Sequence, residues 1–110
     1  MILRHYKPPR HDPGKNPAYL SWIRTLPCLV CWTWRIRSGR DSKVEAAHVG
    51  VRGLSRKCPD CEAIPLCIWH HRTGPQSHHQ LGKGFWTFWK LNRMEVIREY
   101  QDKFAKEKAA

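Results

Sequence analysis

The stretch EAAHVGVRGLSRKCPDCEAIPLCIWHHRTGPQSHHQLG, residues 45–82, decides the fold of this chain. Two short apolar runs, at residues 44–49 and 63–66, have the composition and length of strands. A basic, glycine-containing loop separates them. We expect a helix to begin at residue 67 and to end before Gly74-Pro75. The stretch therefore predicts two strands followed by a helix.

The residues before this stretch predict a basic arm and a helix. Residues 1–15 combine prolines with Lys and Arg, so we expect a flexible basic N-terminal arm. Asn16-Pro17 is typical of a helix start, and Pro27 ends that helix. Residues 28–34 are short and apolar, and they predict a strand or knuckle that carries a pair of cysteines.

The residues after this stretch predict an aromatic cluster and a final helix. We expect the aromatic side chains of residues 85–89 to fill the core rather than to stack on bases. Asn92, with Glu95 three residues later, is a capping-box arrangement that opens an amphipathic helix in the segment 91–110. The apolar face of this helix is expected to comprise Met94, Ile97, Tyr100 and Phe104.

The composition favours one small basic domain. The chain has 110 residues and a net charge of +11, which favours nucleic acid as a partner. The mean hydropathy is -0.65, and the longest apolar stretch, residues 26–32, is too short to cross a bilayer. The first residues lack the apolar core of a secretion signal, so we expect a cytoplasmic protein with no membrane partner.

The cysteines predict a structural zinc site, with two possible ligand sets. Their number is odd, so they cannot form a complete disulfide framework. Cys28 and Cys31 form a C-x-x-C pair that can hold half of a tetrahedral zinc site. Cys58 and Cys61 repeat this spacing and would complete an all-cysteine site, which spacing alone slightly favours. The other candidate pair is Cys67 and His70.

The histidines predict a second site. His70 and His71 are adjacent on the expected helix, so their side chains point about 100° apart and cannot easily bind the same ion. His78 and His79 follow shortly after. His48 ends the first expected strand, beside the basic loop. A strand histidine that faces a metal held from a helix suits hydrolysis of a phosphodiester.

Four short sequence segments together resemble a known protein family. They are LPCLVC at residues 26–31, AAHV at 46–49, PLCIWHH at 65–71 and HRTGPQSHHQLG at 71–82. Over residues 20–90 the chain resembles the HNH-type (ββα-metal, His-Me finger) nuclease core. More narrowly it is similar to the small phage and prophage nucleases of the Ref recombination-enhancement type.

The resemblance implies an α+β fold, in which a two-stranded hairpin and a helix wrap around a catalytic metal. The zinc-stapled nuclease core would span residues 16–90, with flanking helices. The resemblance shifts the choice of structural zinc ligands to Cys28, Cys31, Cys67 and His70. It assigns His71 to the catalytic cation and His48 to the role of general base.

The chain departs from the family pattern at two points. Ala47 stands directly before the general base, where many members carry a metal ligand, and the central Asn is absent. Glu45, Asp60 or His79 can supply the missing ligand, and Asp60 can instead orient His48. We expect His71 and His79 to hold a divalent cation such as Mg²⁺, Mn²⁺ or Zn²⁺. The residues expected to contact phosphates are Arg52, Arg56 and Lys57.

Three functions follow from these expectations, and the third is an RNA-binding knuckle protein that would stack bases on the aromatic cluster of residues 85–89. The first is a metal-dependent DNA endonuclease, encoded by a phage or prophage, that leaves a 5′-phosphate and a 3′-hydroxyl on duplex or single-stranded DNA. The alternative is a non-catalytic, zinc-stapled DNA-binding protein that assists a recombinase. The missing ligand before His48 and the high positive charge fit this alternative.

Overall fold

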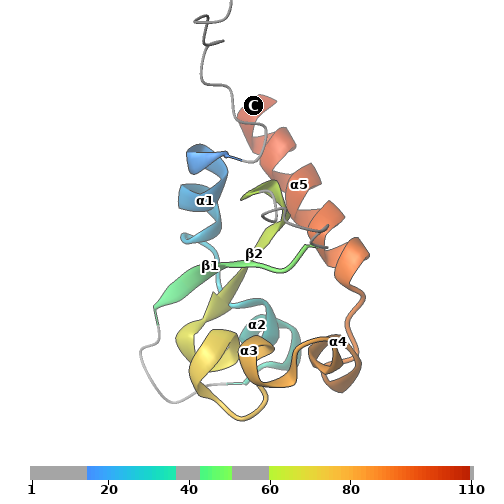
Figure 1. The fold of residues 1–110 in the computed structure, drawn as a ribbon. Helices are drawn as coiled ribbons and strands as arrows, with labels where there is room; N and C mark the ends of the chain where they lie inside the picture. The colour runs from blue at the N-terminus through green and yellow to red at the C-terminus, as the bar shows by residue number, and fades with distance from the viewer. Residues whose placement is uncertain (1–14, 37–42, 51–59, 110) are drawn as a thin grey trace, which may run out of the picture.

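The computed structural model describes residues 15–36, 43–50 and 60–109, and its fold is α+β, as expected (Figure 1). In chain order the described elements are α1 (Pro17–Ile23), α2 (Leu29–Trp34), β1 (Val44–His48), the 3₁₀ turn η2 (Asp60–Glu62), β2 (Ala63–Cys67), the π-helical turn η3 (Trp69–Thr73), α3 (His78–Leu81), α4 (Gly84–Phe88) and α5 (Arg93–Ala109). Of the expected N-terminal arm, only Lys15 is described. Among these residues, no helix has both the length and the apolar character needed to cross a membrane.

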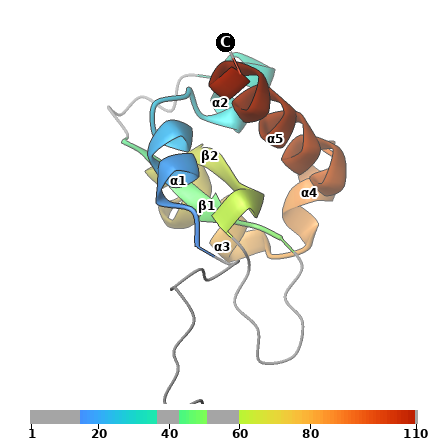
Figure 2. The ribbon, with the colours of Figure 1, turned by 90° about the horizontal axis from the view of Figure 1, so that it is seen from above.

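The two expected strands form one antiparallel sheet. Val44 pairs with Cys67 at one end, and His48 pairs with Ala63 at the other. All five residues of β2 are buried, because α1 and α5 pack on either side of this strand (Figure 2). The register therefore fixes Cys67 and His48 at opposite ends of the hairpin.

The main core lies among α2, the hairpin, α4 and α5, and α1 packs beside it on α5. Tyr19 of α1 packs edge-on against Phe104 of α5, with ring centroids 4.9 Å apart. The main cluster of buried side chains comprises Cys28, Leu29, Val30, Ala47, Val49, Ile64, Leu66, Cys67, Phe85, Val96 and Ile97. Because α5 contributes two of these residues, it packs into the same core as the hairpin.

Two helix starts follow the sequence prediction. The Asn16 side chain accepts a hydrogen bond from the backbone N–H of Tyr19 at 3.1 Å, and Pro17 occupies the first position of α1. At the start of α5, the Asn92 side chain accepts from the backbone N–H of Glu95 at 2.9 Å. Each contact satisfies a backbone donor that a helix start leaves unpaired.

Three expectations need correction. Residues 28–34 form a helical turn rather than a strand, because a helix places side chains three apart on the same face, as the first cysteine pair requires. On α5, Met94 is half exposed, and Val96 enters the core instead. In the aromatic cluster Phe85 is fully buried but Phe88, the last residue of α4, is 52% exposed, so only part of the cluster fills the core.

The turn after η3 leaves no room for a side chain at Gly74. A Cβ atom there would lie 2.7 Å from both the Cε2 atom and the backbone oxygen of Trp69. We therefore expect Gly74→Ala to lower the free energy of unfolding by about 1–3 kcal/mol, as overpacking does. Gly84→Ala is the matched control, because nothing lies within 4 Å of its added Cβ. Urea denaturation of both variants tests this, and an equal stability of the two would contradict it.

Candidate functional site

Four side chains that can bind a metal meet at one end of the sheet. They come from the start of α2, from within α2, from the end of β2 and from η3, and they are Cys28, Cys31, Cys67 and His70. Their ligand atoms all lie within 4.8 Å of one another. No disulfide joins the described cysteines.

The distances among these atoms fit a tetrahedral ion. A tetrahedral zinc site with thiolate and imidazole ligands has sulfur–sulfur edges of about 3.8 Å and sulfur–nitrogen edges of about 3.5 Å. The sulfurs of Cys31 and Cys67 are 3.9 Å apart. His70 Nδ1 lies 3.7 Å from the Cys28 sulfur, 3.5 Å from that of Cys31 and 3.3 Å from that of Cys67. The four residues are thus positioned to hold a metal ion.

The structure brings together one of the two ligand sets that the sequence left open. Cys61 lies in η2, at the far end of β2 from Cys67, and is not part of the cluster. Its proposed partner Cys58 lies outside the described residues. The hydrogen bond between the Cys28 and Cys67 thiols lowers the pKa of Cys67 and raises that of Cys28, so one proton is shared between two buried sulfurs.

At the other end of the hairpin, His48 forms a pair with Asp60. His48 Nε2 lies 2.8 Å from Asp60 Oδ1, and the backbone N–H of Asn16 donates to Asp60 Oδ2 at 2.8 Å. Burial opposes ionisation of Asp60, but these hydrogen bonds hold its pKa below the ordinary value. Because an ionised carboxylate can only accept, His48 Nε2 donates the proton and Nδ1 keeps its lone pair.

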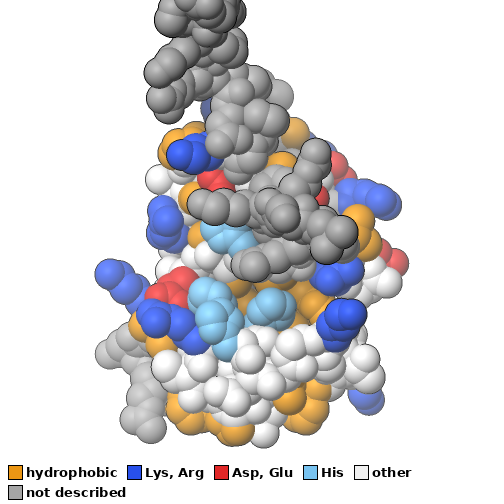
Figure 3. Space-filling view, in the orientation of Figure 1, with side chains coloured by type: hydrophobic (Ala, Val, Ile, Leu, Met, Phe, Trp, Pro, Cys, Tyr) orange, Lys and Arg blue, Asp and Glu red, His pale blue; other side chains and the backbone are white. Residues whose placement is uncertain are grey.

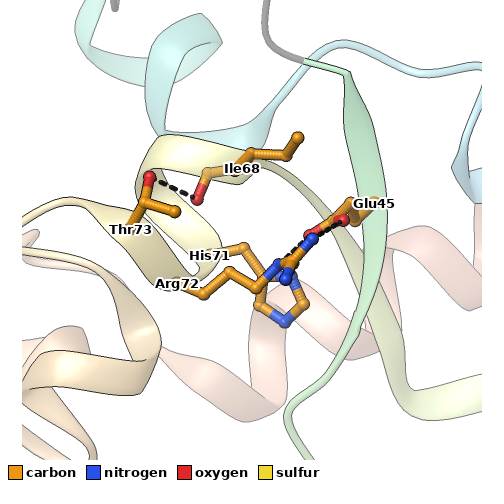
Figure 4. Close-up of polar contacts among 5 residues, drawn as sticks. All are labelled: Glu45, Ile68, His71, Arg72 and Thr73. Atoms are coloured by element: carbon orange, nitrogen blue, oxygen red, sulfur yellow. Dashed lines mark hydrogen bonds and ion pairs between the residues drawn. The ribbon is translucent and has the colours of Figure 1, made fainter.

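A second carboxylate, that of Glu45 on β1, holds His71 (Figure 4). The Arg72 guanidinium donates to both oxygens of Glu45, at 3.0 and 2.7 Å, and lowers the pKa of Glu45 to about 2. The ionised Glu45 also accepts from His71 Nδ1 at 2.7 Å. Burial lowers the pKa of His71, so its ring is neutral and Nε2 is available as a ligand atom.

The remaining histidines extend this group on one face of the molecule (Figure 3). The His71 and His79 rings lie edge to face, 4.7 Å apart. His79 shares with His48 a hollow of about 580 Å³ that is also lined by Val49, Gly50, His78, Gly82, Lys83, Trp86 and Arg93. We call this the histidine hollow. Its cations and imidazoles give it the chemistry of a phosphate-binding site.

His78, Lys83 and Arg93 line the hollow, although the sequence motifs gave none of them a role. The Ser77 side chain accepts from the backbone N–H of Gln80 and so starts α3 at His78. Burial lowers the pKa of His78 to about 4, and its ring packs against Phe85. The sequence identified both histidines as candidate site residues, but only the fold shows that His78 lines the hollow.

The expected phosphate contacts Arg52, Arg56 and Lys57 lie outside the described residues.

In comparisons with protein-family models, with curated proteins and with solved structures, nothing matched this chain significantly. Any functional proposal therefore depends on the site geometry and on the sequence motifs.

The four-ligand cluster predicts the metal content of the protein. We expect one tightly bound zinc ion per chain, and we expect Cys31→Ser to lose it, because a tetrahedral site would then lack one thiolate. Cys61→Ser is the matched control and should keep the ion, since Cys61 lies outside the cluster. Elemental analysis after desalting measures this. Zinc lost from the Cys61 variant but retained by the Cys31 variant would contradict the assignment.

Proposed function

We propose that this chain is a metal-dependent DNA endonuclease of the HNH type, held together by a structural zinc ion. One observation carries the proposal: a strand–strand–helix unit presents His48 and His79 to the same hollow, and His71 contacts His79. This is the order of elements and of residues that the resemblance implies. The net charge of +11 supports a nucleic-acid substrate.

In this proposal His48 is the general base. Asp60 accepts a hydrogen bond from the Nε2–H group, so Nδ1 is the nitrogen that takes a proton from the attacking water. Asn16 in turn holds Asp60 through its backbone N–H. The Asp60 carboxylate thus fixes the tautomer and stabilises the imidazolium that forms, which is the orienting role considered from the sequence.

The catalytic cation would bind at His71 and His79. His71 would use Nε2, because Glu45 occupies its Nδ1. When bound, the cation would stabilise negative charge on the phosphate and on the leaving oxygen. Imidazole ligands suit Mn²⁺ or Zn²⁺ better than Mg²⁺, which prefers oxygen. Lys83 and Arg93 at the hollow would bind the flanking phosphates, together with Arg52, Arg56 and Lys57.

A specific observation also favours the non-catalytic alternative. The Glu45 carboxylate is already held by Arg72 through both oxygens. Apart from the cysteine–histidine cluster, the described residues contain no group of three metal-ligating side chains within binding distance of one another. Ala47, in the position where many family members carry a ligand, is buried in the core. A DNA-binding protein that assists a recombinase would need no catalytic cation.

Cleavage of supercoiled plasmid and of single-stranded DNA separates these functions. We expect wild type to cleave with Mn²⁺, Mg²⁺ or Zn²⁺ added, and His48→Ala to lose at least about 100-fold in rate, because it removes the general base. Zinc content and DNA affinity of the variant should be unchanged. Binding without cleavage by wild type in every metal would establish the accessory function instead.

The Asp60 pair gives a finer test. Asp60→Asn replaces an acceptor by an amide that can donate to His48 Nε2, which would move the proton to Nδ1 and remove the base. We expect cleavage to slow at least tenfold, with little change in substrate affinity. Asp102→Asn, an exposed position on α5, is the control for the charge change. Equal rates for the two variants would show that Asp60 does not orient His48.

A further inference from the structure

The end of the molecule formed by α2 and α4 carries exposed aromatic side chains. Among the described residues, three of the four exposed large hydrophobic side chains belong to these helices. Trp32 is 73% exposed, Trp34 is 43% exposed and Phe88 is 52% exposed. Such rings on a small domain mark a surface that a partner covers.

Trp34 and Phe88 come together where the end of α2 meets the end of α4, whereas Trp32, two residues before Trp34, faces another side of α2. Trp34 Nε1 donates to the backbone oxygen of Trp89 at 3.1 Å, and the rings of Phe88 and Trp89 lie 4.9 Å apart, edge to face. Trp32 and Arg35 line a neighbouring hollow of about 680 Å³. We call Trp32, Trp34 and Phe88, with Arg35 and Lys90, the aromatic patch.

Both cations of the aromatic patch adopt a backbone conformation that disfavours side chains. Arg35 has φ of 52° and Lys90 has φ of 54°, and they are the only non-glycine residues with positive φ among those described. Glycine is the ordinary residue at such a helix end. Here two cations occupy these positions, each directly after an aromatic residue, although both cost backbone strain. Strain of this kind clusters at functional sites.

The two chain segments that carry the aromatic patch contain charged side chains of one sign only. Residues 13–40 and 63–94, which include both helices, contain no Asp or Glu, so all nine acidic residues lie elsewhere. A surface with cations, aromatic rings and no nearby acid in sequence is complementary to a polyanion with exposed flat faces. Single-stranded nucleic acid has this chemistry, whereas the bases of a duplex are already stacked.

We propose that the aromatic patch is a second nucleic-acid site, which binds a single strand by stacking unpaired bases on Trp32, Trp34 and Phe88. Arg35 and Lys90 contact its phosphates. The site is separate from the histidine hollow and does not depend on hydrolysis there. Binding at the aromatic patch would hold an unpaired strand at one end of the domain.

The test is fluorescence anisotropy with a labelled oligothymidylate of about 12 nucleotides, a length that such sites cover. The same strand paired with oligodeoxyadenylate is the duplex probe. All variants carry His48→Ala, and no divalent cation is added, so cleavage cannot interfere. We expect Phe88→Ala to weaken single-strand binding about tenfold and duplex binding much less. Phe88→Tyr should restore single-strand binding.

The cation variants separate binding from folding. Arg35→Gly/Lys90→Gly removes two charges and relieves both strained residues, so thermal stability should be unchanged or higher. The slope of log affinity for the single strand against log salt concentration should become shallower by about 1.4, or about 0.7 per cation. Lys103→Ala/Lys106→Ala, at exposed positions on α5, is the charge-matched control.

Three results would overturn the proposal. The first is single-strand affinity that is equal in wild type and Phe88→Ala. The second is equal losses on single strand and duplex. The third is self-association of the wild type that Phe88→Ala abolishes with no change in single-strand affinity, which would make the aromatic patch a protein interface. None of these results bears on cleavage at the histidine hollow.

Discussion

The structure depends most on the cluster of three cysteines and one histidine. Its ligands come from α2, from the last residue of β2 and from η3, so one ion would join three segments that short elements alone hold weakly. Binding energy of this kind is folding energy, since the unfolded chain has no preformed site. Because Cys67 is paired with Val44, the same ion would also fix the hairpin end from which η3 starts.

The rest of the candidate site follows from that anchor. Once His70 points toward the sulfurs, its neighbour His71 faces Glu45 on β1, and Arg72 closes the same carboxylate. His48 lies at the end of the hairpin opposite Cys67. Asp60 lies at the same end, in the η2 turn directly before β2. In this arrangement two carboxylates each fix one imidazole tautomer: Asp60 that of His48, which lines the histidine hollow, and Glu45 that of His71, which contacts His79.

The sequence predicted those features of the fold that depend on residues close together in the chain. The strands and the α1 and α5 starts at Asn16 and Asn92 follow from periodicity and capping, whereas the α+β class was implied by the resemblance. Spacing could not choose between Cys58/Cys61 and Cys67/His70, because that choice depends on β2 carrying Cys67 away from Cys61. The helical form of α2 was missed because the cluster geometry overrides a weak strand preference. The Glu45–Arg72 pair depends on the packing of η3 against β1, which no local pattern encodes.

X-ray absorption at the zinc edge of the purified protein would report the ligands of the ion. We expect three sulfurs at about 2.3 Å and one nitrogen at about 2.0 Å from the metal. A shell of four sulfurs would contradict this expectation, because the cluster contains only three cysteines. Such a shell would mean that Cys58 and Cys61 complete the site in place of Cys67 and His70. The ion would then no longer hold η3 in the position on which the histidine site depends.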